Sequence, residues 1–548
     1  MIQGSAVAGS APATAGGGSF TGTWGLVRFM LRRDRVRLTA WAGGFALLVA
    51  YLVVGIPAAY GTEEELGAIA QIFADPVGRL LVGPAYGITD PTYESLIANG
   101  YGLYFLIMSV LMSFLLVVRH TRLEEQTGRA ELVRANVVGR HASLSAAMIV
   151  AVVNNAVVAV VIVAAMMAAG FGAEGSMLFG ASVAAGGLAF AGVAALTAQL
   201  SAFSRAAAGM AGAVLGIAFV IRAGGDMAAE GGTTLSWFSP LAWSQQTAPF
   251  VLDRWWPLAL SLGFAAVMTV AGFAVSTRRD VGASLIAVRR GSPEAAGWLR
   301  SPLALAVRLQ RSSTLWWTLA LTVSGLLFGA FTETMLSAFE ELPPVFIELF
   351  GGAEELVAGY LGYMALYMAW IAGAYAVLSV VGLRGEETSG RLEPVLATPV
   401  SRWVWLGGNI VVSAVGAVIV LGVTGVSTGV GAAVVTGDDT LIADLTVAHL
   451  NQVPPVLVVL GVAALLFGVF PRAIGLAWVL VGYGLFAGTF GQLLDLPAWA
   501  LDLSPYAHPA RMPLESFEGA PVVVLIVVAV AASFVGLLGF RRRGIESV

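Results

Sequence analysis

The sequence predicts an all-α polytopic membrane protein with twelve transmembrane helices, arranged as two parallel six-helix repeats. Hydrophobic residues make up 58% of the chain and charged residues 11%, whereas a soluble domain has about 25% charged residues. Apolar stretches recur that are long enough to cross a bilayer, which takes roughly 20 residues. A charged segment of nineteen residues occurs twice, at a constant offset of 262 residues.

The N-terminal residues 1–23 carry no charge and are rich in Gly, Ala and Ser, which predicts a disordered tail. Residues 24–39 then combine five arginines with aromatic and aliphatic side chains, a pattern typical of a basic amphipathic helix at the membrane surface. Arg32 and Arg35 recur at an offset of 276 as Arg308 and Arg311, so a second helix of this kind is expected at 300–314.

Six apolar spans are expected in each half. They lie at about 40–58, 101–118, 143–169, 178–200, 206–222 and 257–275, and again at about 315–331, 362–383, 404–436, 453–470, 472–490 and 519–540. Gly224, Gly225 and Asp226 are expected in a loop after the fifth span. The polar segments 59–100 and 332–361 are long and are expected to form amphipathic outer helices.

Two homologous halves follow from this pattern, at 24–285 and 300–548, joined by a linker at 286–299. An even number of spans per half gives both halves the same orientation in the membrane. All 29 basic residues are Arg, and 25 of them fall on one side of the membrane if the N-terminus is cytoplasmic. The positive-inside rule therefore predicts that both termini and the linker are cytoplasmic, in the cell membrane.

The repeated charged segments occupy 122–140 and 384–402, and ten of their nineteen positions are identical. If each begins as a helix, Glu125 and Arg129 lie four residues apart, in the order that favours an ion pair. Gly128 would then lie between two carboxylates, where a side chain would block close packing. We expect a protein-docking surface on each segment, formed by Glu124, Glu125, Gly128, Arg129 and Glu131, and by Glu386, Glu387, Gly390, Arg391 and Glu393.

Several activities are excluded by composition. The chain has no Lys, so it lacks the Lys of a phosphate-binding Walker A loop. It has no Cys, and its four His are scattered without the spacing of metal ligands. Candidate catalytic residues do not converge, so we expect a protein that is not an enzyme and that binds no cofactor or metal itself.

The motif Glu-Glu-x-x-Gly-Arg-x-Glu, placed after the second of six spans and preceded by a basic amphipathic helix, resembles the membrane subunit of type-two ABC exporters. The resemblance is strongest to the fused, duplicated permeases of actinobacterial antibiotic efflux systems of the tetronasin or anthracycline type. It implies elbow helices at 24–39 and 300–314, and coupling elements at 122–140 and 384–402. It also implies two copies of a separate ATPase subunit, which would bind ATP and Mg²⁺.

The same resemblance implies export of hydrophobic drugs or antibiotics by alternating access, with substrate contacts in the second, fifth, eighth and eleventh spans. Aromatic and Met residues that suit varied apolar ligands occur there at near-helical spacing. The candidates are Phe105, Met108, Met112, Tyr363, Met364, Tyr367 and Met368. Ordinary helix packing explains each of them equally well.

Two alternative functions stay open. An exporter of a lipid or cell-envelope component would use the same mechanism and the same motifs. An ion-coupled secondary drug transporter would also have twelve spans, but it needs ionisable residues inside them. None is expected in the middle of the four candidate substrate-binding spans.

Overall fold

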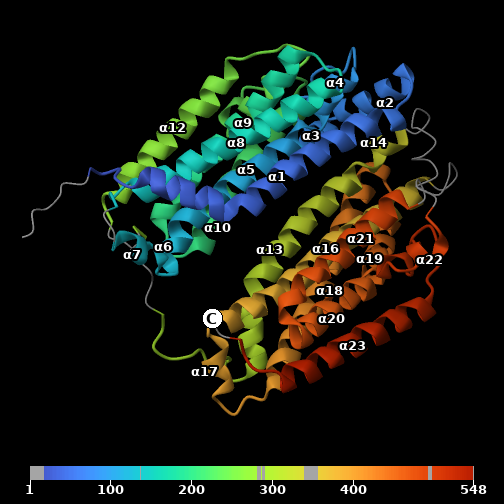
Figure 1. Ribbon diagram of the computed structural model, residues 1–548. Helices are drawn as coiled ribbons and strands as arrows, with labels where there is room; N and C mark the ends of the chain where they lie inside the picture. Colours follow the sequence, from blue (N-terminus) through green and yellow to red (C-terminus); the bar gives the residue numbers. More distant parts are fainter. Residues whose placement is uncertain are drawn as a thin grey trace, which may run out of the picture. The chain divides into compact units, whose positions relative to one another are not determined.

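The computed structural model describes residues 18–135, 138–279, 285–286, 291–337, 356–491 and 496–546. Within these ranges all regular structure is helical, and twelve helices are long and apolar enough to cross a membrane (Figure 1). The chain divides into two compact units, unit 1 at Met1–Arg290 and unit 2 at Gly291–Val548, with six of the long helices in each. The prediction of an all-α polytopic membrane protein is confirmed.

Unit 1 contains the helices coloured blue to green in Figure 1. They are α1 (Thr23–Ala59), α2 (Glu63–Ala74), α3 (Pro76–Val82), α4 (Tyr93–Ser95), the π-turn η1 (Leu96–Gly100), α5 (Gly102–Val118), the π-turn η2 (Arg119–Leu123), α6 (Glu124–Gln126), α7 (Arg129–Arg134), α8 (Ala142–Ala168), α9 (Ala173–Leu200), α10 (Ser204–Ala228), the 3₁₀ turn η3 (Ser236–Phe238), α11 (Pro240–Gln245) and α12 (Pro257–Ser276).

Unit 2 contains the helices coloured yellow to red. They are α13 (Pro302–Ala330), α14 (Thr332–Ser337), α16 (Leu356–Thr388), α17 (Leu392–Leu396), α18 (Arg402–Thr436), α19 (Thr440–Asn451), α20 (Val453–Val469), the 3₁₀ turn η6 (Pro471–Leu476), α21 (Ala477–Phe490), α22 (Ala498–Leu501), the 3₁₀ turn η7 (Pro505–Ala507) and α23 (Gly519–Arg542).

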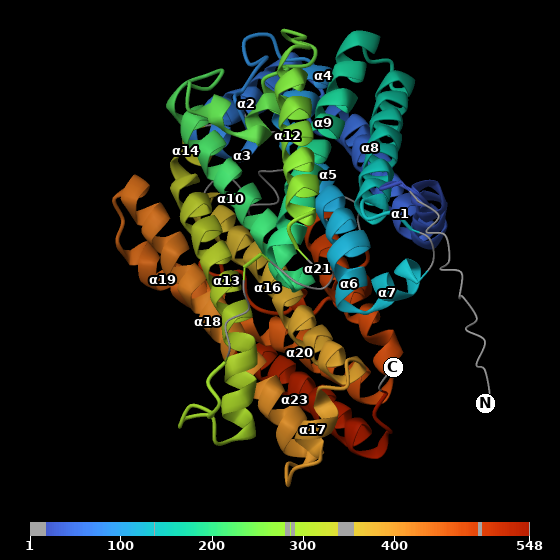
Figure 2. The same cartoon turned by 90° about the vertical axis from the view of Figure 1, so that its left-hand side faces the viewer.

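Helix α9 forms the centre of unit 1, where it packs against α5, α8, α10 and α12. In the turned view it lies between α8 and α12 (Figure 2). Its many Gly and Ala residues allow the neighbouring helices to approach closely, as at helix interfaces in membranes. At Gly187, for example, a Cβ would lie 2.1 Å from the Asn155 Oδ1 atom, which accepts a hydrogen bond from Ser109.

Helix α20 has the corresponding place in unit 2, packed against α16, α18, α21 and α23. The contact of α9 with α12 is repeated by α20 with α23. A Cβ on Gly192 would lie 2.7 Å from the carbonyl oxygen of Ala265, and a Cβ on Gly461 would lie 2.6 Å from that of Ala529. The same small-residue contact recurs, with the partners exchanged, at the pairs Gly272–Ala195 and Gly536–Ala464. The duplication seen in the sequence is therefore a duplication of helix packing.

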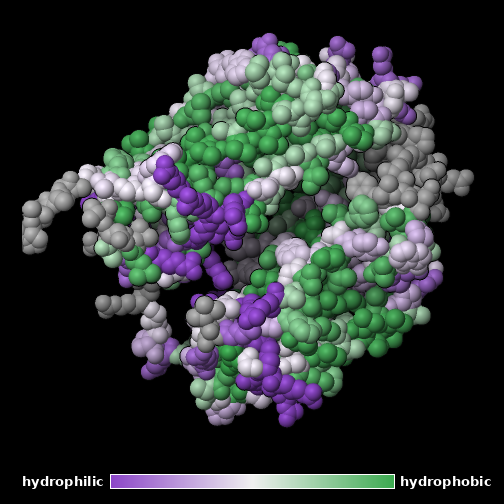
Figure 3. Space-filling view, in the orientation of Figure 1, coloured by the Kyte–Doolittle hydropathy of each residue, from purple (hydrophilic) through white to green (hydrophobic). Residues whose placement is uncertain are grey.

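The surface agrees with this architecture. In the space-filling view the flanks of the long helices are mostly apolar, and hydrophilic residues gather toward helix ends (Figure 3). Many of the apolar side chains on these flanks are exposed, including Val267 on α12 and Val527 on α23. Exposed apolar side chains on this scale are typical of a surface that faces lipid.

Three of the predicted boundaries differ from the structure. Residues 24–39 and the first span form one continuous helix, α1, and residues 302–330 likewise form α13. No Pro lies between 24–39 and the span, and the helix continues through the glycine pair Gly43 and Gly44 at the start of the span. The tenth span is longer than predicted, because α19 precedes α20. Of the outer segment 332–361, residues 338–355 lie outside the described part of the chain.

The third difference concerns residues 224–226, which lie in α10 and not in a loop. Asp226 is buried there, and its Oδ2 atom lies 3.4 Å from Nη1 of Arg222, which is buried as well. Arg222 also donates to the carbonyl oxygens of Arg79 and Leu80, and Ser236 donates to Asp226 over 2.6 Å. These contacts satisfy both charges and attach α3 to the end of α10. The fifth long helix therefore carries a buried ion pair near its end, where a loop was predicted.

Candidate functional site

Each charged segment continues a long helix and then bends at a glycine. In unit 1, α5 continues through η2 and α6 to Gln126, and Gly128 separates it from α7. In unit 2, α16 runs to Thr388, and Gly390 separates it from α17. Gly128 has φ of 74° and Gly390 has φ of 71°, and no atom lies within 4 Å of a Cβ built on either residue. The glycines are required for a left-handed backbone and not, as predicted, for close packing.

The bend prevents the predicted ion pair between Glu125 and Arg129, because the two residues lie on different helices. Glu125 instead accepts hydrogen bonds from Arg279, with Nη1–Oε2 and Nη2–Oε1 distances of 2.8 Å. Arg279 follows α12, so this contact joins the end of the second long helix of unit 1 to the end of the sixth.

Unit 2 repeats this contact with equivalent residues. Glu387 accepts hydrogen bonds from both terminal nitrogens of Arg543, and the Nη2–Oε2 distance is 2.8 Å. The side chain of Glu387 is fully buried, whereas that of Glu125 is 15% exposed. A bidentate contact between a guanidinium and a carboxylate fixes both distance and orientation.

A second arginine reaches each carboxylate from three residues earlier. Arg122 contacts Glu125 and also donates to the carbonyl oxygen of Ser201, while Arg384 Nη1 lies 3.5 Å from Oε2 of Glu387. The two halves therefore contain the same arrangement of one carboxylate between two arginines. If the arginine after the last helix were lost, the carboxylate would keep only the arginine three residues earlier as its ionic partner.

The last residues of the segments, Arg140 and Arg402, contact the ends of the same final helices. Arg140 donates to the carbonyl oxygens of Ser276 and Thr277, the latter over 2.6 Å. Arg402 donates to those of Phe540 and Arg543, over 3.1 and 2.5 Å. A cation at a helix C-terminus satisfies free carbonyl groups and interacts favourably with the helix dipole. We call these two groups the latches: Arg122, Glu125, Arg140 and Arg279 in unit 1, and Arg384, Glu387, Arg402 and Arg543 in unit 2.

The other predicted docking residues have different environments. Arg129, Glu131, Arg391 and Glu393 are exposed on or next to the short helices α7 and α17. Arg391 forms an ion pair with Glu386, with an Nη2–Oε1 distance of 2.8 Å, and Glu124 pairs with Arg33 of α1. The predicted elbow residues are all exposed, namely Arg32, Arg35, Arg308 and Arg311.

The two halves differ in how the first helix contacts the charged segment. In unit 1, Asp34 is buried and lies 2.6 Å from Nε2 of His120 and 2.8 Å from Nη1 of Arg119. At the offset of 276 residues Asp34 corresponds to Gln310, which hydrogen-bonds with Asn409 and Ser413 instead. Ionic contacts thus hold the first helix of unit 1, and neutral amide contacts hold that of unit 2.

The C-terminal residues add one more contact to the latch of unit 2. Arg384 donates to Glu546 over 2.7 Å, and the backbone N–H of Glu546 donates to Glu387 over 3.1 Å. The hydrogen bond from Arg384 lowers the pKa of Glu546 below its ordinary value. Glu546 therefore attaches the segment after α23 to the second charged segment.

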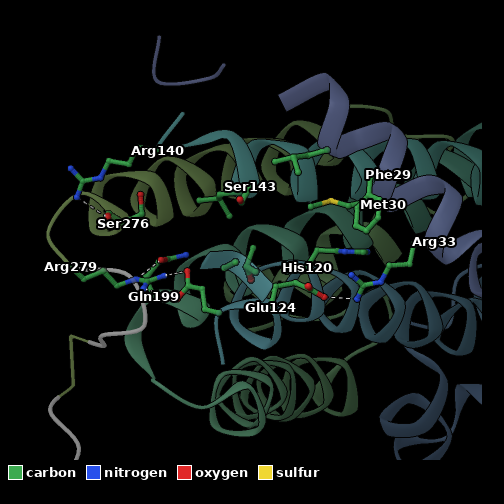
Figure 4. Close-up of a pocket in the computed structure, with 15 residues that line it drawn as sticks. Phe29, Met30, Arg33, His120, Glu124, Arg140, Ser143, Gln199, Ser276 and Arg279 are labelled. Atoms are coloured by element: carbon green, nitrogen blue, oxygen red, sulfur yellow. Dashed lines mark hydrogen bonds and ion pairs between the residues drawn. The ribbon is translucent and has the colours of Figure 1, made fainter. Parts of the chain in front are cut away.

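A cavity of about 310 Å³ lies beside the latch of unit 1, between the start of α1, the charged segment, the start of α8 and the ends of α9 and α12 (Figure 4). The side chains that line it include Phe29, Met30, Glu124, Arg140 and Arg279. No group of three or more His, Asp or Glu in the described ranges is placed to hold a metal ion.

The candidate substrate-binding residues fall into two groups. Phe105, Met112, Met364 and Met368 are buried within their own units. Phe105, for example, packs its ring against Phe45 and Phe179. Met108, Tyr363 and Tyr367 are only half-buried. Contact of any of the seven residues with a substrate stays a prediction.

Several residues at this site were not assigned a role from the sequence. Arg279 and Arg543 belong to arginine pairs that recur between the halves, and that recurrence was the available signal. Asp34 and His120 carry no signal of this kind, since neither is repeated. Only folding brings them together, because 86 residues separate them in the chain.

Two comparisons with known proteins show what this chain is similar to. The family model described as "Multidrug efflux system permease Rv1217c, C-terminal domain" matches residues 299–541. The chain is also 36% identical over 543 residues to the multidrug efflux system permease protein Rv1217c of Mycobacterium tuberculosis (strain ATCC 25618 / H37Rv). That alignment covers 97% of this chain and 96% of the relative, and so includes both charged segments.

Proposed function

Because the chain belongs to the family of the multidrug efflux permease Rv1217c, we propose that it is the membrane subunit of an ATP-driven exporter of hydrophobic drugs. The observation that carries this proposal is the duplicated latch. Each half presents a short charged helix, α7 or α17, and fastens its base to the end of the last long helix of that half. Two equivalent attachment points suit two copies of one partner subunit.

The partner would be a separate ABC ATPase, which binds ATP and Mg²⁺. A chain without Lys has no Walker A loop of its own, so hydrolysis must occur elsewhere if ATP is used. The Arg distribution supports a cytoplasmic position for both charged segments and both termini, where such an ATPase would be located.

Within each charged segment, exposed and buried residues would have different roles. The exposed Arg129, Glu131, Arg391 and Glu393 would contact the ATPase. Glu125 and Glu387 would act inside the permease, since a buried and paired carboxylate is not available to a partner. Movement of α7 or α17 would then be transmitted through the latch to α12 or α23, and would drive alternating access of the substrate-binding surface.

Reconstitution into vesicles tests this function. We expect transport of a hydrophobic fluorescent dye to require both ATP and a lone ABC ATPase subunit from the same genome. In the variant Glu131→Arg/Glu393→Arg, we expect loss of ATPase binding and of transport, with unchanged thermal stability. Glu174→Arg, an exposed charge at the opposite end of unit 1, is the matched control and should retain both. Dye transport driven by a proton gradient without any ATPase would refute the proposal.

The cargo defines the second candidate function, export of a lipid or cell-envelope component. Met108, Tyr363 and Tyr367 present adaptable apolar surfaces that suit either class of ligand. A competition assay separates them: drugs should inhibit labelled-dye export by a drug exporter, whereas phospholipid added to the vesicles should inhibit a lipid exporter.

A further inference from the structure

The cavity beside the latch of unit 1 has the shape and chemistry of a ligand site. Its volume of about 310 Å³ is at the lower end of the range for small-molecule pockets, roughly 300–1,000 Å³. Phe29 and Met30 of α1 lie along one side, and Glu124, Gln199 and Arg279 lie along the other (Figure 4). The cavity is therefore amphipathic, with an apolar wall opposite a charged one.

The charges around the cavity are unequal. Four arginines line it or contact its lining residues, against three carboxylates. The arginines are Arg33, Arg122, Arg140 and Arg279, and the carboxylates are Asp34, Glu124 and Glu125. Arg33 and Arg279 each have a carboxylate partner. Arg140 has none among the described residues and uses only Nη2 on backbone carbonyls, so the excess positive charge lies on its side.

The equivalent space in unit 2 is filled. At the offset of 262 residues, Ser143 in the cavity wall corresponds to Trp405, and at the offset of 264, Ser276 corresponds to Phe540. Trp405 and Phe540 are buried, and their ring centroids are 5.4 Å apart. Phe467 completes this aromatic cluster, with its ring centroid 5.5 Å from that of Phe540.

Comparison of the two units shows that the contacts of a latch form without a cavity beside them. Unit 2 forms the same contacts of Glu387 with Arg543 while aromatic rings fill the space around them, and the Arg543 guanidinium lies 5.0 Å from the Phe540 ring centroid. Close packing is the normal condition of a protein interior. Unit 1 has an open, charged cavity at positions where unit 2 has large aromatic residues. This difference indicates that the cavity of unit 1 binds a ligand.

We propose that unit 1 binds one amphiphile with an anionic head group in this cavity. The head group lies toward Arg140 and Ser143, and the apolar part lies against Phe29, Met30 and Leu144. A phospholipid phosphate and a free carboxylate amphiphile share this chemistry. The proposal concerns binding by this chain alone, and it does not depend on ATP-driven export or on the partner subunit.

Native mass spectrometry of the full chain in a neutral detergent tests the proposal with three probes: dodecanoate, phosphatidylglycerol, and dodecyltrimethylammonium as a cationic control of equal chain length. We expect one dodecanoate or one phosphatidylglycerol to bind at least about tenfold more tightly than the cation. Preference for phosphatidylglycerol identifies a membrane lipid as the source, and preference for dodecanoate identifies a free amphiphile.

Two variants copied from unit 2 close the site, Ser143→Trp and Ser276→Phe, singly and combined. We expect the combined variant to lose anion binding about tenfold or more while keeping its thermal unfolding midpoint, since unit 2 accommodates both side chains. Val267→Phe, on an exposed position of α12, is the control and should bind as the parent does. If the combined variant does not fold, each single variant provides the same measurement. Equal binding of anion and cation, no binding of either anion, or undiminished binding by the filled variants would overturn the proposal.

Discussion

Arg543 donates hydrogen bonds from both terminal nitrogens to the two carboxylate oxygens of Glu387, and Arg279 makes the same contact with Glu125. The glutamates lie 262 residues apart and the arginines lie 264 apart. Because both contacts are bidentate, the base of each charged segment is fixed in orientation to the last long helix of its half. The duplicated segments are thus parts of the permease framework as well as exposed surfaces.

The latch predicts a large difference between two adjacent arginines. Arg543→Ala leaves the buried carboxylate of Glu387 with only its longer contact to Arg384 and the C-terminal tail, and should reduce the free energy of unfolding by roughly 3–5 kcal/mol. Arg542→Ala removes an exposed charge and is the matched control. Thermal unfolding in detergent measures both. A partial recovery of stability in Glu387→Arg/Arg543→Glu would show that the loss of stability comes from the ion pair. Equal stability of the Arg542→Ala and Arg543→Ala variants would contradict the predicted role of Arg543.

The bend at Gly128 predicts that the same substitution has opposite effects at two glycines. Gly128→Ala places a Cβ in the left-handed region, at a cost of about 1–2 kcal/mol. Gly209 lies in α10 with open space around it, and Gly209→Ala should be neutral or stabilising, by up to about 1 kcal/mol. Gly128→Asn should be tolerated better than Gly128→Ala, because Asn adopts this conformation more readily. If Ala and Asn are equally harmful in thermal unfolding, the requirement is not for backbone conformation.

The buried pair of Arg222 and Asp226 predicts a result that separates a structural role from ion coupling. Asp226→Asn keeps one acceptor oxygen and replaces the other by an NH2 donor, so only one of the hydrogen bonds from Ser236 and Arg222 can be kept. We therefore expect ATP-dependent transport to persist with reduced stability. Arg222→Met leaves the carboxylate unpaired and should destabilise the chain by roughly 3–5 kcal/mol. Dye transport under an imposed pH gradient is the measurement. If the parent protein transports dye under the pH gradient without ATP, and Asp226→Asn loses this transport, the result would favour a secondary transporter.

The contact of Arg384 with Glu546 predicts a pH-dependent position of the C-terminal tail. Since this hydrogen bond lowers the pKa of Glu546, the contact is present above the ordinary carboxylate pKa and is lost as the pH falls through the lowered value. Hydrogen exchange of the segment 541–546 should therefore accelerate in acid, after correction for intrinsic rates. In Glu546→Gln the exchange should be fast at every pH. Unchanged protection in that variant would show that the side chain does not hold the tail.

Local sequence features were sufficient to predict the helices. Apolar length located the twelve long apolar helices of the described ranges, since satisfying the backbone inside a bilayer leaves few alternatives to a helix. Prediction was less accurate at helix ends, where sequence signals are weak. Gly224 and Gly225 suggested a loop, but the contacts of Arg222 and Asp226 with Ser236 and with α3 keep α10 helical there.

For the charged segments, the repeat located the right residues and local spacing assigned the wrong contacts. Glu125 and Arg129 have the spacing of a helical ion pair, yet the left-handed Gly128 separates them. The true partner, Arg279, lies 154 residues away in the chain. A contact between residues so far apart leaves no periodic pattern in the local sequence. The repeated arginine pair was its only trace in the sequence.

By itself, then, the sequence determined the all-helical membrane class, the duplication and the position of the two charged segments, because each follows from composition or from a comparison of the chain with itself. Only the tertiary structure decided which carboxylates are exposed and which are buried within a latch. It also decided that Ser143 and Ser276 line a cavity while Trp405 and Phe540 fill the equivalent space. Burial and pairing depend on side chains brought together from distant helices, and packing sets them rather than spacing along the chain.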